Sequence, residues 1–305
     1  MSARAFAKVI LLGEHAVVHG RLAVAAALDR GARAEASRCD APSTLRLEPW
    51  GRTVRSDEDD EIGRAFAAVI EAVAGPGENF EARVDVEVPA GAGLGCSAAI
   101  AVALARAIAE AADVAIDHDA AARAGGAWER VFHGNPSGVD AAVAARGGVL
   151  AFRRGEPPRR VAPREPIPLA VAFTGESAST RQMVAQVQRQ LDRRPQVVER
   201  TFDGLDTLAL KSVGAIEGGR LHELGRLMDL GHALLSSLLV STERLELTCN
   251  LARGAGALGA KLTGGGGGGC AIALAPGNLE NVLEAWRRAG IEGFAATIPA
   301  VSNAS

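Results

Sequence analysis

The chain has 305 residues, enough for two domains or for two lobes that share a substantial core. Its formal net charge of -3 and the lack of a long basic run argue against nucleic acid as a partner. The first eight residues lack the apolar run of a signal peptide, no stretch approaches the roughly 18 apolar residues of a membrane-spanning helix, and the four cysteines form no CxxC pair. We therefore expect a reduced, cytoplasmic protein with no membrane partner.

The first third of the chain shows clear strand and helix periods. Residues 5–12 are apolar and end at a glycine, which predicts a buried strand and a turn. Residues 22–37 become alternating, as expected for a strand with one wet face. Residues 61–74 carry apolar side chains at helical spacing, and residues 80–88 alternate until Pro89. These patterns predict strand, strand, helix and strand in that order.

The remaining two thirds mix helices and strands without regular alternation. We expect helices at 97–112, 118–132 and 279–288, a mostly helical stretch at 179–256, and strands at 148–152, 168–173, 257–262, 270–274 and 294–298. This order favours a two-lobe α+β fold over a doubly wound parallel sheet. Residues 157–168 are rich in proline and arginine and mark the expected lobe boundary. The predicted division is an N-terminal lobe of 1–160 and a C-terminal lobe of 161–305.

A glycine loop at 89–99 reads Pro-Ala-Gly-Ala-Gly-Leu-Gly-Cys-Ser-Ala-Ala, between an expected strand and an expected helix. Glycines at 91, 93 and 95 allow left-handed backbone angles and close approach to a ligand. Free N–H groups at a helix start attract phosphate. The loop lacks the Gly-Lys-Ser/Thr of a Walker A motif and the spacing of a dinucleotide fingerprint. Taken alone, it is either a phosphate site or a flexible turn with Ser97 near a helix N-cap.

A second glycine run, Gly264 to Gly269, lies between two apolar segments. A flexible linker is one interpretation. The apolar flanks argue against it, and each ordered glycine costs backbone entropy, so a buried run needs a reason. Close approach to a ligand or to the first glycine loop would supply that reason.

Three charged residues are candidates for chemistry. Lys8 lies within an apolar strand, which is costly unless the ammonium is paired or reaches the surface. Glu129 lies near the end of an expected helix, and Asp140 follows a turn-forming stretch at 134–138. Singly, these carboxylates read as a surface charge and a helix cap. Together beside a phosphate site, one would suit Mg²⁺ and the other an acceptor hydroxyl.

These segments together resemble a known family. Residues 8–20, Lys-Val-Ile-Leu-Leu-Gly-Glu-His-Ala-Val-Val-His-Gly, and residues 133–140, His-Gly-Asn-Pro-Ser-Gly-Val-Asp, resemble motifs of the mevalonate kinases. Residues 89–99 and 260–270 resemble the glycine motifs shared by the superfamily of galactokinase, homoserine kinase, mevalonate kinase and phosphomevalonate kinase (GHMP kinases). The motifs follow the family order. The resemblance implies a two-lobe α+β fold with the active site in the cleft between the lobes.

The resemblance also implies roles for individual residues. ATP phosphates would bind at Gly91, Ala92, Gly93, Leu94, Gly95, Cys96, Ser97 and Ala98. Ser97 and Glu129 would hold Mg²⁺, and Asp140 with Lys8 would activate the primary hydroxyl of mevalonate. The acceptor would contact Glu14, His15, Thr180, Gly264 and Gly265, with His15 bound to a carboxylate or hydroxyl. Cys96 and Gly265 depart from the serine and alanine usual in relatives. The sequence allows a homodimer.

Three other interpretations stay open at this point. The chain could be another kinase of the superfamily, acting on phosphomevalonate, homoserine or a sugar, or a mevalonate kinase that phosphorylates a different position. It could be a nucleotide-binding relative without catalysis, although Lys8, Ser97, Glu129 and Asp140 are all present. It could also be an interaction protein in which the glycine runs are linkers.

Overall fold

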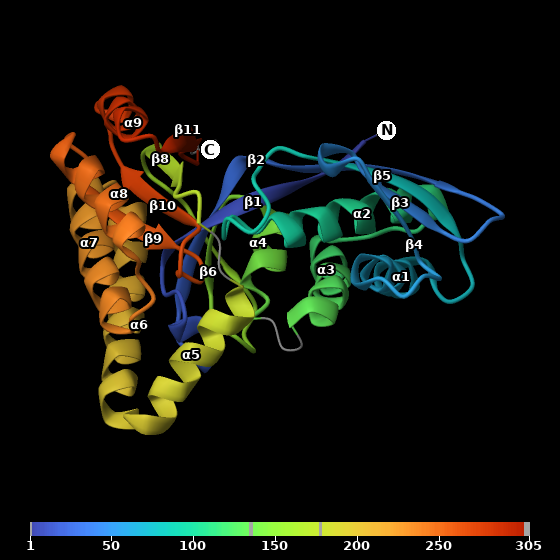
Figure 1. The fold of residues 1–305 in the computed structure, drawn as a ribbon, viewed down its shortest axis with the longest axis horizontal. Helices are drawn as coiled ribbons and strands as arrows, with labels where there is room; N and C mark the ends of the chain where they lie inside the picture. Colours follow the sequence, from blue (N-terminus) through green and yellow to red (C-terminus); the bar gives the residue numbers. More distant parts are fainter. Residues whose placement is uncertain (1, 134–136, 177–178, 302–305) are drawn as a thin grey trace. The chain divides into compact units, whose positions relative to one another are not determined.

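The computed structural model describes residues 2–133, 137–176 and 179–301. The chain forms two compact units that interleave in sequence. Unit 1 comprises Met1–Lys8, Arg30–Ala90 and Gly95–Gly147, and unit 2 comprises Val9–Asp29, Gly91–Leu94 and Gly148–Ser305. Strands β1 (Ala3–Leu12) and β2 (Ala23–Arg38) each contribute residues to both units (Figure 1).

The predicted division at residue 160 used one boundary, whereas the chain crosses between the units several times and last at Gly147 to Gly148. The proline- and arginine-rich segment is not a boundary. It contains β7 (Arg159–Val161), which pairs antiparallel with β6 (Val149–Phe152) inside unit 2. The backbone hydrogen bonds of this short strand outweigh the turn-forming composition around it.

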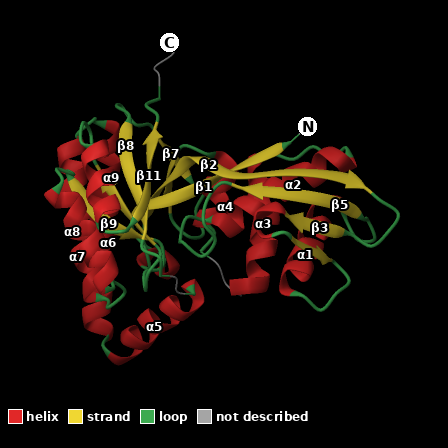
Figure 2. Cartoon of the chain, turned by 45° about the horizontal axis from the view of Figure 1, so that its top comes forward, coloured by secondary structure: helices red, strands yellow, loops and turns green. Residues whose placement is uncertain are grey.

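Unit 1 contains part of a mixed sheet and the helices that cover one of its faces (Figure 2). The second half of β2 pairs antiparallel with β5 (Phe80–Val86), and β3 (Thr44–Leu47) is parallel to β5 and antiparallel to β4 (Arg52–Arg55). Along β5, alternate apolar residues are buried and the charged residues between them are exposed, as the period of two requires. The helices are α1 (Glu61–Ala74), α2 (Cys96–Ala112), α3 (His118–His133) and α4 (Val139–Arg146).

The alanine-rich composition of α2 explains its central place in unit 1. Helix α2 is buried along most of its length and packs against α1, α3 and α4. Small side chains allow this close approach, and at Gly125 of α3 an added Cβ would lie 2.9 Å from Val102 Cγ2. The packing fixes the helix whose first turn follows the first glycine loop.

Unit 2 contains a four-stranded antiparallel sheet in the order β11-β8-β10-β9. The strands are β8 (Ile167–Phe173), β9 (Gly259–Thr263), β10 (Cys270–Leu274) and β11 (Glu292–Ile298). The helices are α5 (Thr180–Arg193), α6 (Pro195–Glu217), α7 (Leu221–Ser237), α8 (Glu243–Gly254) and α9 (Leu279–Arg288). Helices α7 and α8 pack against β9, and the core includes Phe202 and Trp286 (Figure 1). No helix in the described residues is long and apolar enough to cross a membrane.

Candidate active site

The structure brings Lys8 and Asp140 together in unit 1. Lys8 Nζ lies 3.2 Å from Asp140 Oδ1, and the side chain of Lys8 is 3% exposed while that of Asp140 is 30% exposed. Lys8 belongs to β1, and Asp140 lies in the first turn of α4, where the helix dipole favours a carboxylate. The buried strand lysine is therefore paired, and its partner stays accessible to a ligand. The turn before α4 includes residues 134–136, which lie outside the described residues.

Gly95 allows the Lys8 side chain to lie against the start of α2. Gly95 is the N-cap of α2 with a φ of 70°, and an added Cβ would lie 2.9 Å from Lys8 Cγ. A larger residue would be strained by the positive φ and would also contact Lys8. The glycine thus places the lysine beside a helix N-terminus.

Glu129 of α3 is a buried carboxyl near this pair. Burial, and next the negative charge of Asp140, raise the pKa of Glu129 to about 8, against the lowering effect of Lys8. Ser97 Oγ accepts a hydrogen bond from Trp128 Nε1 at 2.9 Å, which orients the hydroxyl. The sequence analysis did not assign Trp128 to the site. The only indication in the sequence was its position next to Glu129.

The residues around Glu129 fit a magnesium ion. Two nearby carboxylates repel each other unless a cation lies between or beside them. Protein sites for Mg²⁺ commonly use one or two carboxylates and leave the other positions to water and substrate phosphates. The described residues contain no group of three or more His, Cys, Asp or Glu side chains that could form a cage for a metal. The Glu129 carboxyl and the Ser97 hydroxyl are oxygen donors, the type of ligand that Mg²⁺ takes.

The first glycine loop has the backbone angles that its sequence predicts. Gly91, Gly93 and Gly95 have φ values of 70°, 78° and 70°. Ala92 and Leu94 are buried, whereas Gly91 and Gly93 line a small cavity. The loop leads into α2, whose first N–H groups lack intrahelical partners and attract anions.

Cys96, the first residue of α2, adds no charge to this loop. Burial raises the pKa of its thiol to about 11, so the thiol stays protonated at neutral pH. Compared with the serine usual in relatives, Cys96 therefore lacks a hydroxyl but adds no thiolate to the loop. Ser97 and Ala98 follow it in the first turn of the helix.

The hexaglycine run is an ordered turn between β9 and β10. Gly267 N donates to Val240 O at 2.7 Å, and Gly269 N donates to Glu176 O at 2.8 Å. Thr174 Oγ1 donates to Gly269 O at 2.9 Å. Positive φ values are found at Gly264, Gly266, Gly267, Gly268 and Gly269. The interpretation of this run as a flexible linker is therefore wrong.

The two glycine loops lie against each other within unit 2. An added Cβ at Gly264 would lie 3.1 Å from Gly93 O, and one at Gly269 would lie 3.0 Å from Ala92 O. Such distances are shorter than ordinary side-chain contacts, so only glycine allows the approach. Of the two reasons considered for a buried glycine run, the structure shows close approach to the first glycine loop.

His15, Thr180 and Gly265, three of the residues predicted to contact the acceptor substrate, lie close together. His15 Nε2 lies 2.9 Å from Gly265 O, and an added Cβ on Gly265 would lie 3.5 Å from Thr180 Cα. Thr180 is the first residue of α5 and lines a small cavity together with residues of both glycine loops. His15, Thr180, Gly264 and Gly265 therefore belong to one region of unit 2.

The hydrogen bond of His15 settles its protonation. A carbonyl oxygen only accepts, so Nε2 carries the proton and Nδ1 is left as an acceptor. Burial lowers the pKa of His15 to about 4, so the ring is neutral at pH 7. Of the two ligands expected for His15, a hydroxyl that donates to Nδ1 fits a neutral ring better than a carboxylate does.

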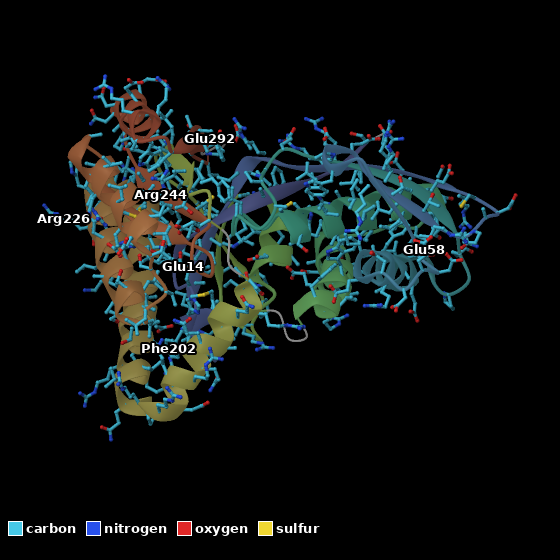
Figure 3. The ribbon with its side chains drawn as sticks, in the orientation of Figure 1. Glu14, Glu58, Phe202, Arg226, Arg244 and Glu292 are labelled. Atoms are coloured by element: carbon cyan, nitrogen blue, oxygen red, sulfur yellow. The ribbon has the colours of Figure 1, made fainter. Side chains whose placement is uncertain are left out.

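Glu14 forms an ion pair with Lys261, a residue that sequence reasoning did not assign to the site. Lys261 Nζ contacts Glu14 Oε1, and the lysine and glutamate side chains are 0% and 1% exposed. Lys261 Nζ also donates to Leu262 O at 2.6 Å and to Ile10 O at 3.4 Å. Figure 3 labels Glu14 just beyond the end of β1. The sequence feature that could have identified Lys261 is its position as a lysine within the otherwise apolar segment 257–262.

The segment that follows Glu14 and His15 is fixed to α6. Arg21 pairs with Glu199 at 2.7 Å and with Asp203 at 2.9 Å. The His19 ring stacks on Phe202, labelled in Figure 3, with the ring centroids 4.6 Å apart. These contacts on the 3₁₀ turn η1 (Ala16–His19) and the residues after it limit movement of the acceptor residues.

Comparisons with known proteins agree with the sequence motifs. The GHMP kinases N-terminal domain family matches residues 61–148, and the GHMP kinases C-terminal family matches residues 212–292. The mevalonate kinase of Pyrococcus abyssi is 36% identical over 312 residues, which cover 94% of this chain and 92% of that relative.

Solved structures show the same fold. The crystal structure of Leishmania major mevalonate kinase in complex with R-mevalonate has a TM-score of 0.85 at 27% identity and covers 98% of this chain and 96% of its own. The Streptococcus pneumoniae phosphomevalonate kinase in complex with phosphomevalonate and AMPPNP has a TM-score of 0.84 at 20% identity and covers 98% of this chain and 100% of its own. Because both share the fold, the fold does not identify the acceptor.

Proposed function

This chain belongs to the mevalonate kinases of the GHMP kinase superfamily, and from this premise we propose that it transfers the terminal phosphoryl group of ATP to the primary hydroxyl of mevalonate. The observation that carries the proposal is the pairing of Lys8 with the accessible carboxylate of Asp140 beside the start of α2. Phosphoryl transfer depends mainly on positioning and charge stabilisation, which this arrangement supplies.

In unit 1, Asp140 and Lys8 act on the acceptor oxygen. Asp140 accepts a hydrogen bond from the primary hydroxyl and takes its proton. The Lys8 ammonium, 3.2 Å from Asp140 Oδ1, stabilises the negative charge that develops on the attacking oxygen. The first N–H groups of α2, which begins at Cys96 in the same unit, bind the phosphates of ATP.

Ser97 and Glu129 would hold Mg²⁺, which when bound would neutralise charge on the phosphates. The hydrogen bond from Trp128 keeps the Ser97 hydroxyl in place. The pKa of about 8 leaves Glu129 largely protonated at neutral pH. A carboxyl group binds a metal in its deprotonated form, so Glu129 must lose this proton when Mg²⁺ binds. A bound cation would supply the positive charge that favours the carboxylate form.

In unit 2, the acceptor is oriented by neutral and fixed groups. His15 Nδ1 accepts from a hydroxyl of the acceptor, and the Thr180 hydroxyl adds a further donor or acceptor. Glu14 has its orientation fixed by Lys261. The backbone of Gly264 and Gly265 borders the same region.

The test is a reaction of the purified chain with mevalonate and Mg·ATP, followed by phosphorus NMR of the product. We expect one new phosphomonoester on the primary oxygen and one equivalent of ADP. Phosphomevalonate, homoserine and galactose are assayed in parallel by coupled ADP release. Turnover of one of these in place of mevalonate would contradict the proposed acceptor, and ATP binding without turnover of any acceptor would contradict catalysis.

A further inference from the structure

A buried polar network in unit 2 has no part in the proposed reaction. His232 of α7 is 4% exposed and its Nε2 lies 3.2 Å from Glu246 Oε2 of α8. Ser236 Oγ donates to the other carboxylate oxygen of Glu246 at 2.8 Å. Glu246 therefore fixes the imidazole at one ring nitrogen and is itself fixed by Ser236.

The other ring nitrogen of His232 binds the backbone of β9. Leu262 N donates to His232 Nδ1 at 3.3 Å. Nδ1 must therefore be the acceptor, and Nε2 carries the proton that it donates to Glu246. The charged groups that face His232 are Glu246, Arg253 and Lys261. The neutral Nε2–H tautomer satisfies both hydrogen bonds at once.

This hydrogen bond lies next to Lys261. Leu262 is bound at both backbone groups, with its N–H on His232 and its carbonyl oxygen on Lys261 Nζ at 2.6 Å. Lys261 in turn contacts Glu14. On its other edge β9 pairs with β10, where Ala271 lies opposite Leu262. A change at His232 would therefore act first on the residue that helps to position the Lys261 ammonium.

We propose that His232 and Glu246 are positioning residues for the acceptor, acting through the backbone of β9 on Lys261 and through Lys261 on Glu14. The inference rests on the proposed function, in which His15, the residue after Glu14, binds the acceptor. Small displacements of groups that orient a substrate are costly to binding and rate. The network should therefore affect use of the acceptor more than use of ATP.

A matched pair of variants tests this role. His232→Leu removes both hydrogen bonds while filling a similar volume, and His232→Asn keeps an oxygen that can accept from Leu262 N–H. We expect His232→Leu to raise KM for mevalonate by about tenfold, the loss that corresponds to one hydrogen bond, with KM for ATP changed less than about twofold. We expect His232→Asn to restore most of the affinity for mevalonate.

A second variant covers the case in which His232→Leu does not fold. Glu246→Ala removes a side chain that is 42% exposed, so no sealed cavity results. It should raise KM for mevalonate in the same direction and by a smaller factor. Unchanged KM for mevalonate in folded His232→Leu or Glu246→Ala protein, or equal values for the Leu and Asn variants, would overturn the proposal.

Amide hydrogen exchange at Lys261 and Leu262 separates this inference from the proposed function. Exchange there should be faster in His232→Leu than in His232→Asn, whether or not mevalonate is the acceptor. If another acceptor of the panel is turned over, the proposed function fails and the same KM comparison is made with that acceptor. Equal exchange rates at β9 in wild type and His232→Leu would overturn the positioning role.

Discussion

Two lysine–carboxylate pairs, one in each unit, differ in access to ligands. Lys8 and Lys261 are both buried, but Asp140 is 30% exposed and Glu14 is 1% exposed. A carboxylate that a ligand can reach can exchange a proton with it, whereas a sealed pair can only fix geometry. The sealed pair bears a desolvation cost, which backbone carbonyls around Lys261 partly offset.

Strand β1 links the two pairs along the chain. Lys8 lies within β1, and Glu14 follows shortly after its end. Each residue finds its partner on a different element, Asp140 on α4 and Lys261 on β9. One short stretch of chain thus supplies the lysine of one pair and the carboxylate of the other.

The largest effect on turnover is expected when the accessible pair of Lys8 and Asp140 is broken. Asp140→Asn should lower turnover by on the order of 10³-fold or more, because it removes the proton acceptor and the partner of Lys8. Thermal unfolding should change little, since the side chain is partly exposed. Asp119→Asn is a matched control in the same unit, as Asp119 is an exposed carboxylate paired with Arg146. Near-normal kcat in Asp140→Asn would remove Asp140 from the mechanism.

Breaking the sealed pair should lower stability first. Lys261→Met leaves Glu14 buried without its cation, and the free energy of unfolding should fall by about 3–5 kcal/mol in urea titration. The double variant Lys261→Met/Glu14→Leu should recover much of this loss. Lys8→Met should instead reduce turnover more than stability. A Lys261→Met protein as stable as wild type would show that the sealed pair has no fixing role.

Two neighbouring glycines, Gly265 and Gly266, differ in how much room the structure leaves for a Cβ atom. Gly266 has a φ of 73° and an added Cβ would lie 2.2 Å from Val240 O, so Gly266→Ala should cost about 1–3 kcal/mol from crowding, with backbone strain in addition. At Gly265 the nearest contact would be an ordinary 3.5 Å, so Gly265→Ala should change stability by less than about 1 kcal/mol. Urea unfolding of both variants measures the difference. Equal losses would mean that the turn does not need glycine at Gly266.

The last prediction concerns the pH dependence of stability that Glu129 causes. Burial raises the folded pKa of Glu129 to about 8 from the ordinary 4.5 of a glutamate, so the stability that this group contributes is fully present below about pH 4.5 and is lost as pH rises toward 8. The loss is at most about 1.4 kcal/mol per pH unit. Glu129→Gln should remove this decline in metal-free protein, as urea unfolding at pH 5 to 8 would show. Parallel pH profiles for the two proteins would refute the raised pKa.

Elements with strong local patterns could be predicted from the sequence. Helix α1 has the bounds that its apolar spacing predicts, and β5 alternates as its residues do. The positive φ values at Gly91, Gly93 and Gly95 follow from a residue type that tolerates them. The ordered motifs also identified the family, because several independent strings had to agree. Strands β3 and β4 were missed, since four residues carry too little period to detect.

The contacts between distant groups and their protonation states follow from the folded structure and not from local sequence. Nothing local to Lys8 or Lys261 indicates that one pairs with Asp140 and the other with Glu14, because the partners lie far apart in the chain. The neutral state of His15 and the raised pKa of Glu129 arise from burial by several elements. Periodicity and turn chemistry act over a few residues, whereas pairing and desolvation depend on the path of the whole chain.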